Sequence, residues 1–182
     1  MKDFEIRVAT EADVPAVVNL ANQYTFQNLS EQERQTGFLT GVFTEVAVRS
    51  MITSAPSIVA YNQQELAGFI LNTNLLANQY PPLVQEIIKE LSQLMFREIP
   101  VEQFRYFFYG PVLVARKYRQ HGLLKKLFMK TKEELSTKFN LGIAFIDQDN
   151  DSSFRVHKNL GWEVIGEILF NNRTYAILAF AL

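Results

Sequence analysis

The fold of this chain is decided by the stretch Val112-Leu113-Val114-Ala115-Arg116-Lys117-Tyr118-Arg119-Gln120-His121-Gly122-Leu123-Leu124. It begins with an apolar run typical of a buried strand and passes through a basic turn into a segment with helical periodicity. That segment, Gly122 to Phe139, places the mostly apolar side chains of Leu124, Leu127, Phe128, Thr131 and Leu135 on one helical face. The stretch therefore predicts a strand that turns directly into an amphipathic helix.

The junction between this strand and helix has the chemistry of an anion site. Several N–H groups at a helix N-terminus point at one place, where a diphosphate gains both hydrogen bonds and the favourable end of the helix dipole. Gly122 lets the backbone approach such a ligand closely. Cations gather on and near the turn, at Arg116, Lys117, Arg119, Lys125 and Lys126. The alternative is a solvated basic turn that binds nothing.

Downstream of this stretch, strands and helices alternate, which is typical of an α/β protein. We expect a short buried strand over Gly142 to Asp147 and a helix over Asp151 to Asn159. Two strands, Trp162 to Phe170 and Thr174 to Leu182, then form a terminal hairpin across Asn171-Asn172.

Upstream, Phe4 to Val8 predicts a strand, and Thr10 followed by Asp13 predicts the start of a helix. Asn22 to Thr44 mixes polar and aromatic residues and is interpreted as a loop with a short helix. The remaining expected elements are a hairpin of Ser57 to Tyr61 and Leu66 to Leu71, an amphipathic helix from Pro81-Pro82 to Met95, and an aromatic strand, Arg105 to Val114. Gly110-Pro111 predicts a bulge or splay in that last strand.

Composition limits the chain to one expected domain, residues 1–182, and disfavours several kinds of site. The 182 residues include 15 Phe and 48% hydrophobic residues, enough for one sizeable core. The absence of Cys and the presence of two His argue against disulfides, a cysteine nucleophile and a metal site. A formal net charge of −1, with basic residues that cluster on one phosphate-sized loop instead of forming an extended stripe, disfavours nucleic-acid binding. No apolar run has the length of a signal peptide or a membrane span, so we expect a cytoplasmic protein without membrane association.

Two motifs resemble those of the GNAT family (GCN5-related N-acetyltransferases). Arg119-Gln120-His121-Gly122-Leu123-Leu124 is similar to the family's R/Q-x-x-G-x-G/A, with Leu124 in place of the last small residue. Asn150, Ser153, Gly161 and Trp162 match N-x-x-A/S-x-x-x-Y-x-x-x-G-F/W in register, with His157 at the Tyr position. Ile6 to Asp13 and Leu66 to Phe69 are similar to the family's early elements, so the resemblance spans almost the whole chain. It implies a single central mixed, mostly antiparallel sheet of about six to seven strands, splayed after the fourth strand and flanked by helices.

The resemblance also implies a reaction and a cosubstrate. The family transfers acetyl from acetyl-CoA to an amine by direct attack, without a metal. The cofactor contacts carried over are the backbone near Leu113 and Val114, the turn from Arg119 through Gln120, His121, Gly122 and Leu123 to Leu124, and the side chains of Asn150 and Ser153. His121 contributes its backbone N–H, with its ring in solvent.

The candidate catalytic residues are His157, Tyr109 and Asp147. At the family's Tyr position, His157 donates a proton to the departing sulfur as an imidazolium or hydrogen-bonds it as a neutral ring; the alternative is a histidine without a proton role. Tyr109, with Tyr106, and Asp147, with Glu102, are candidates for the general base. Aromatic residues on a central strand are usually core, and Asp147 is alternatively an ordinary loop acid.

The acceptor stays open between a small-molecule amine and a protein amine. The family's acceptor pocket corresponds here to the segment with Tyr24, Phe26, Phe38 and Phe43, which hints at a partly apolar amine, although satellite packing explains these aromatics equally well. A second hypothesis is a non-catalytic acyl-CoA-binding sensor or interaction module of the same fold. A homodimer that pairs Thr174 to Leu182 between subunits and a monomer in which this strand is internal are both compatible with the sequence.

Overall fold

The computed structural model describes residues 3–182. Their main sheet has seven strands in the order β1-β2-β3-β6-β7-β9-β8, antiparallel throughout except for the parallel pair β6 and β7. The expected mixed, mostly antiparallel sheet is confirmed. The strands are β1 (Glu5–Val8), β2 (Ile58–Asn62), β3 (Glu65–Thr73), β4 (Met95–Phe96), β5 (Ile99–Pro100), β6 (Tyr106–Val114), β7 (Leu141–Asp147), β8 (Glu163–Phe170) and β9 (Arg173–Ala181). The α-helices are α1 (Val14–Gln23), α2 (Glu31–Arg34), α3 (Glu45–Ser54), α4 (Pro82–Glu90), α5 (Leu123–Leu135) and α6 (Asp151–Asn159).

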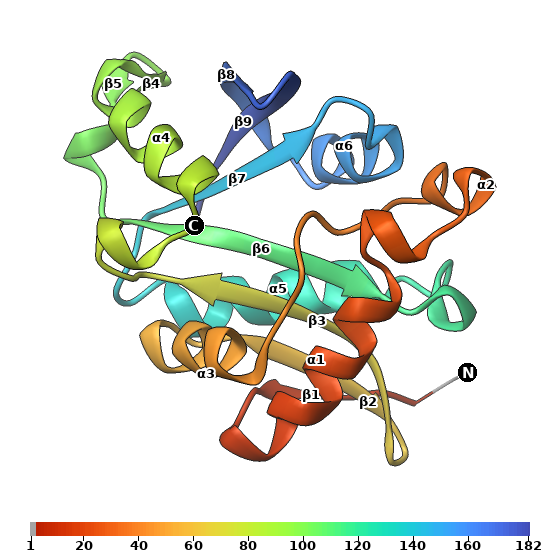
Figure 1. Cartoon of the computed structure of the whole chain (residues 1–182). Coiled ribbons are helices and arrows are strands. Elements are labelled where there is room, and N and C mark those ends of the chain that lie inside the picture. The colour runs from red at the N-terminus through yellow and green to blue at the C-terminus, as the bar shows by residue number, and fades with distance from the viewer. Residues whose placement is uncertain (1–2) are drawn as a thin grey trace.

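Helices cover both faces of the sheet (Figure 1). α5 lies behind the sheet in this view, and α1, α3 and α4 lie on the opposite side. Because side chains alternate along a strand, Phe107 and Tyr109 of β6 join the core cluster under α5, whereas Phe108 joins the cluster under α4. A separate cluster packs α1 and α3 onto β2 and β3. The central strand β6 thus connects the two layers of core.

The parallel pair β6 and β7 opens into a splay. Tyr106 to Phe108 pair with Leu141 to Ile143, and beyond these residues the two strands diverge, with α6 following β7 (Figure 1). On the other edge of β6, Val112 pairs with Ile70 and Tyr109 with Asn72. Gly110 and Pro111 therefore face one β3 residue, which is the bulge expected from the sequence. Beyond Phe108, β6 presents one edge to the splay without a strand partner.

The structure corrects the sequence prediction in the middle of the chain. α3 was not predicted; it begins after Thr44, whose side chain accepts a hydrogen bond from the Ala47 N–H at 3.2 Å. The helix expected to reach Met95 ends as α4 at Glu90, because Met95 pairs with Pro100 in a two-stranded ribbon. β9 lies between β7 and β8, so the last strand is internal to this chain. Among the helices within residues 3–182, none combines the length and the apolar content that a membrane span requires.

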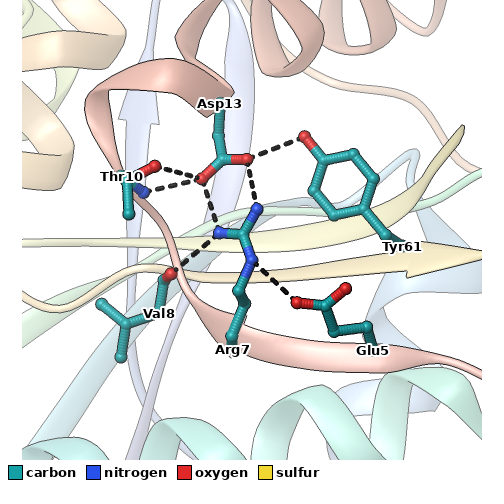
Figure 2. Close-up of polar contacts among 6 residues, drawn as sticks. All are labelled: Glu5, Arg7, Val8, Thr10, Asp13 and Tyr61. Carbon is teal, nitrogen blue, oxygen red and sulfur yellow. Dashed lines mark hydrogen bonds and ion pairs between the residues drawn. The ribbon is translucent and has the colours of Figure 1, made fainter. Parts of the chain in front are cut away.

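A polar cluster around the buried Asp13 joins β1, the start of α1 and β2 (Figure 2). The Asp13 carboxylate accepts hydrogen bonds from both terminal nitrogens of Arg7, at 2.7 and 2.8 Å, and from the Tyr61 hydroxyl at 2.8 Å. It also accepts from the N–H and the hydroxyl of Thr10, at 2.7 and 3.0 Å. Burial by itself would raise the pKa of Asp13, but the hydrogen bonds from Arg7, Thr10 and Tyr61 hold it well below its ordinary value. Asp13 is therefore ionised and fully partnered in the fold.

Candidate functional site

The turn before α5 has the conformation of an anion-binding helix start. Gln120 and Gly122 have positive φ angles of 65° and 68°, and α5 begins at Leu123. The first hydrogen bond of the helix runs from the Lys126 N–H to the Gly122 carbonyl at 3.2 Å. The N–H groups of Leu123, Leu124 and Lys125 therefore precede the intrahelical ladder and are free of intrahelical partners. A Cβ atom on Gly122 would meet no protein atom within 4 Å, so within the chain itself the left-handed backbone selects glycine here, rather than crowding.

A cavity of about 360 Å³ lies at this turn, and we call it the α5 cavity. No carboxylate within residues 3–182 lines it, whereas Arg119 and Lys125 do. Of the residues expected to contact the cofactor, only the exposed His121 is not part of its wall. The wall consists of residues 36–39, 112–114, 118–120 and 122–125, with Asn150, Ser152, Ser153, Val156 and His157. The structure thus brings together two motifs that lie about thirty residues apart in the sequence.

Arg119 stabilises the turn before α5 through two hydrogen bonds to backbone carbonyls. Its Nε donates to the Val114 carbonyl at 2.9 Å, and one terminal nitrogen donates to the Thr36 carbonyl at 2.7 Å. Arg119 therefore holds the end of β6 against the segment after α2 while its charge contributes to the cavity. The sequence predicted a cofactor contact for Arg119 and gave no signal for the contact with Thr36.

A second cavity, of about 190 Å³, lies on the other side of the splay beneath α4, and we call it the α4 cavity. It shares part of its wall with the α5 cavity, so the two cavities meet between β6 and β7. The shared residues are Phe38, Leu39, Val112, Asn150, Ser153 and His157. The splay thus brings two chemically different cavities to one point, next to a histidine.

His157 lies at that meeting point with its side chain 4% exposed. Its Nδ1 lies 2.8 Å from the Ser153 carbonyl oxygen, which can only accept, so Nδ1 carries the proton of the neutral ring. Burial lowers the pKa of His157, and the hydrogen bond to Ser153 opposes this only in part. The ring is therefore neutral near pH 7 with a lone pair on Nε2. This geometry opposes the expected role as proton donor, because the nitrogen left for a ligand is an acceptor.

Tyr109 faces the core beneath α5. Its ring packs against Trp162, with 4.8 Å between centroids, and edge-on against Phe128 and His157. The hydroxyl is buried and has no hydrogen-bond partner in the described part of the chain. Burial raises the pKa of Tyr109, so the phenol stays protonated and is unsuited to act as a base. Tyr109 therefore packs in the core beneath α5 and also lines the α4 cavity, and a catalytic role for it stays a prediction.

Asp147 reaches the α4 cavity but is engaged by the protein. Its carboxylate accepts from Arg173 Nε at 2.5 Å and from the Asp149 N–H at 3.0 Å, and the residue is 5% exposed. Glu102 is exposed, and neither Glu102 nor Tyr106 lines either cavity. Of the candidates for a general base, Asp147 alone has a carboxylate in the wall.

Asn150 also has a structural task. Its side-chain oxygen accepts from the Ser153 N–H at 3.3 Å and caps α6, while its amide nitrogen donates to the Phe38 carbonyl at 2.9 Å. The sequence predicts that Asn150 hydrogen-bonds a ligand. Such a hydrogen bond would compete with the cap of α6 and with the hydrogen bond to the Phe38 carbonyl. Phe38 and Phe43 line the α4 cavity, and their part in an acceptor pocket stays a prediction. Tyr24 and Phe26 do not; the Tyr24 hydroxyl accepts from the Arg116 N–H at 2.8 Å.

Comparison with known proteins finds similarity in structure without similarity in sequence. No protein-family profile matches the chain, and no curated protein matches it by sequence. A putative acetyltransferase from Salmonella typhimurium, solved with acetyl-CoA, is 14% identical and has a TM-score of 0.65, over 99% of this chain and 94% of its own. The PaiA N-acetyltransferase from Thermoplasma acidophilum, solved with coenzyme A, is 12% identical with a TM-score of 0.65, over 99% of both chains.

A third solved structure extends the same pattern. The ribosomal-protein-alanine N-acetyltransferase from Brucella melitensis is 18% identical with a TM-score of 0.63, over 98% of this chain and 99% of its own. At such identities the likeness concerns the fold. The three proteins share that fold with this chain from end to end.

Proposed function

We propose that this chain, which has the GNAT fold, is an acetyl-CoA-dependent N-acetyltransferase formed by residues 1–182 as one domain. The observation that carries the proposal is the meeting of the two cavities at the splay, beside His157. One cavity has a cationic helix start without carboxylates, and the other has a largely apolar wall. A transfer reaction needs such an arrangement, because donor and acceptor must reach one point from different sides.

The α5 cavity suits the cosubstrate. In the proposal, the diphosphate of CoA binds to the N–H groups of Gln120 to Leu124, where the helix dipole favours an anion. Arg119 and Lys125 add positive charge. The pantetheine arm follows the unpaired edge of β6 toward His157, past Leu113 and Val114. Leu123 and Leu124 add apolar surface to the same wall.

The chemical step is attack of an amine nitrogen on the thioester carbonyl of acetyl-CoA. A C–N bond forms, the C–S bond breaks, and the second proton of the nitrogen is released to solvent; an acceptor bound as an ammonium ion first loses a proton to become the attacking amine. Nε2 of His157 accepts that proton, directly or through a water molecule, because its lone pair is free while Nδ1–H is held by Ser153. The thiolate departs without an acid, since a thiol pKa of about 8.5 makes it a tolerable leaving group near neutral pH. Backbone N–H groups on the free edge of β6 polarise the carbonyl.

Two measurements test the proposal. Calorimetry is expected to show CoA binding, and thiol release from acetyl-CoA is expected to depend on an added amine. CoA binding without thiol release across a broad panel of amines would support the alternative, a non-catalytic acyl-CoA-binding module. Absence of CoA binding in a folded protein would contradict both.

A further inference from the structure

The walls of the α4 cavity are dominated by apolar side chains from distant parts of the chain. Phe43 precedes α3, Met51 lies on α3, Val84 on α4, Phe108 on β6 and Ile146 on β7. A ligand body that fills this cavity therefore exchanges water for apolar surface on several sides. Such a wall favours an apolar ligand and selects by shape.

Most polar groups in this wall are already satisfied by the protein. The Tyr80 hydroxyl donates to Thr73 Oγ1 at 3.1 Å and accepts from the Leu75 N–H at 3.0 Å. The Asn150 amide is held by Phe38 and Ser153. The Tyr109 hydroxyl and Nε2 of His157 remain for a ligand, so a polar body would leave water and find few partners in return.

The charge of the wall has one sign. With His157 neutral, Asp147 is the one ionised side chain lining the α4 cavity in the described part of the chain, and no Lys or Arg lines it. Asp147 shares Arg173 with the exposed Asp149, so these three residues carry a net charge of −1. An ammonium ion is favoured next to this group, whereas a carboxylate or phosphate would lie there without a counter-ion.

The volume of the α4 cavity favours a small ligand. At about 190 Å³ the cavity is smaller than the pockets of about 300–1,000 Å³ that hold drug-sized ligands. Resting on the proposed function, we infer that the acetyl acceptor is a small primary amine with an apolar body and no anionic group. Its nitrogen meets the thioester beside His157, and its body fills the space beneath α4.

Matched acceptors test this inference. 2-Phenylethylamine and phenylalanine share a ring and an amine and differ by one carboxylate. We expect kcat/KM for 2-phenylethylamine to exceed that for phenylalanine by at least about tenfold, because the carboxylate would be buried unpaired. Spermidine and a short peptide with a free N-terminus are expected to be poorer acceptors than 2-phenylethylamine. Faster transfer to either would overturn the inference and leave the proposed function intact.

A charge placed at the cavity wall provides a second test. Thr40 is exposed and lines the α4 cavity but not the α5 cavity. Thr40→Lys is expected to raise KM for 2-phenylethylamine by roughly three- to tenfold relative to Thr40→Glu, through repulsion of the ammonium. Thr53→Lys, an exposed position on α3 outside both cavities, controls for added charge and is expected to leave this KM unchanged. Equal KM values in both Thr40 variants would contradict the placement of the ammonium.

Binding without turnover separates the inference from the proposed function. Calorimetry with CoA present is expected to show tighter binding of 2-phenylethylamine than of phenylalanine. This expectation holds whether or not the separate assay shows thiol release from acetyl-CoA. Preferential binding without thiol release from acetyl-CoA would preserve the inference about the cavity and remove the proposed function. Equal binding of the two compounds would overturn the inference. Efficient use of hexanoyl-CoA, with 2-phenylethylamine competing against its acyl chain, would also overturn it by assigning the cavity to the donor.

Discussion

Two buried ionisable residues, Asp13 and His157, have opposite surroundings. Asp13 is 3% exposed, and its carboxylate accepts five hydrogen bonds from Arg7, Thr10 and Tyr61 (Figure 2). His157 is 4% exposed, and its one close partner, the Ser153 carbonyl, engages Nδ1. Within residues 3–182 no hydrogen bond to its Nε2 is formed. The two residues are therefore exposed to the same small extent. They differ in whether hydrogen-bonding capacity is left unused, as it is at Nε2 of His157. A saturated group contributes to stability, whereas a buried group with a free lone pair beside two cavities is suited to chemistry.

The largest effect is expected from His157→Phe, which keeps a ring and removes the lone pair. Turnover should fall by about a hundredfold to ten-thousandfold, the contribution of a general base, while affinity for CoA changes little. Steady-state kinetics and calorimetry measure the two quantities. Tyr109→Phe is the matched comparison: Tyr109 also lines the α4 cavity, but the change removes a buried hydroxyl without a partner, so turnover should stay within about twofold and stability should not fall. Comparable losses of turnover in His157→Phe and Tyr109→Phe would contradict the proposal that His157 is the residue that takes the proton.

Asp13→Asn is expected to act on stability alone. It replaces a buried carboxylate and leaves the Arg7 guanidinium, whose side chain is 36% exposed, with the exposed Glu5 as its remaining ion-pair partner. We expect a loss of about 2–4 kcal/mol in the free energy of unfolding, below the full range for buried pairs because solvent reaches Arg7. Urea denaturation measures the loss, and turnover per folded molecule should be unchanged. Glu5→Gln is the control, since Glu5 is 69% exposed and contacts the same arginine. Lost turnover in a folded Asp13→Asn protein would break the comparison.

Two variants of Gly122, in the turn before α5, test the proposed cofactor site. They are Gly122→Asp and Gly122→Asn. Both residues tolerate a positive φ better than other side chains, and they differ by one charge. We expect Gly122→Asp to bind CoA at least about tenfold more weakly than Gly122→Asn, because a carboxylate beside a phosphate site is repelled. Calorimetry at low ionic strength measures the ratio. Equal affinities in the two variants would show that the diphosphate binds elsewhere.

The smallest expected effect is the pH dependence of the free energy of unfolding. His157 and Asp13 change this free energy in different pH ranges. The folded pKa of His157 lies below its ordinary value of 6.5, so the unfolded chain binds a proton first as pH falls, and the free energy of unfolding falls below about pH 6.5. Tyr109 faces the ring and stays protonated, and no charged side chain contributes to this lowered pKa. Asp13, whose folded pKa is also lowered, contributes stability that is present above about pH 4 and is lost below it.

Urea denaturation between pH 8 and pH 4.5 measures this window. The parent protein should lose up to about 1.4 kcal/mol per pH unit below pH 6.5 through His157, and His157→Phe should lack this component. In the same range, turnover by the base mechanism should stay level through neutral pH and fall only in acid. A turnover that instead falls as pH rises through neutrality would support the role of His157 as the proton donor to the departing sulfur.

Patterns between neighbouring residues predicted much of this fold. The turn at Gly122, the bulge at Gly110-Pro111, the helix over Asp151 to Asn159 and the last hairpin all follow from local signals: positive-φ residues, a proline in a strand, an N-cap and alternation. α3 was missed because a loop-like segment precedes it, and its cap at Thr44 is a weak signal by itself.

The sequence by itself determined the strand-to-helix turn and its cations, because both depend on spacing along a short stretch of chain, and the resemblance to a family added Asn150 and Ser153. Tertiary structure alone decided the rest of the site. The contacts of Arg119 with Thr36 and of Asn150 with Phe38 join segments 83 and 112 residues apart. The same packing placed Tyr109 in the core and joined the two cavities at the splay. The protonation of His157 was decided in the same way, because desolvation requires neighbours from several elements, and no local pattern records which segments will provide them.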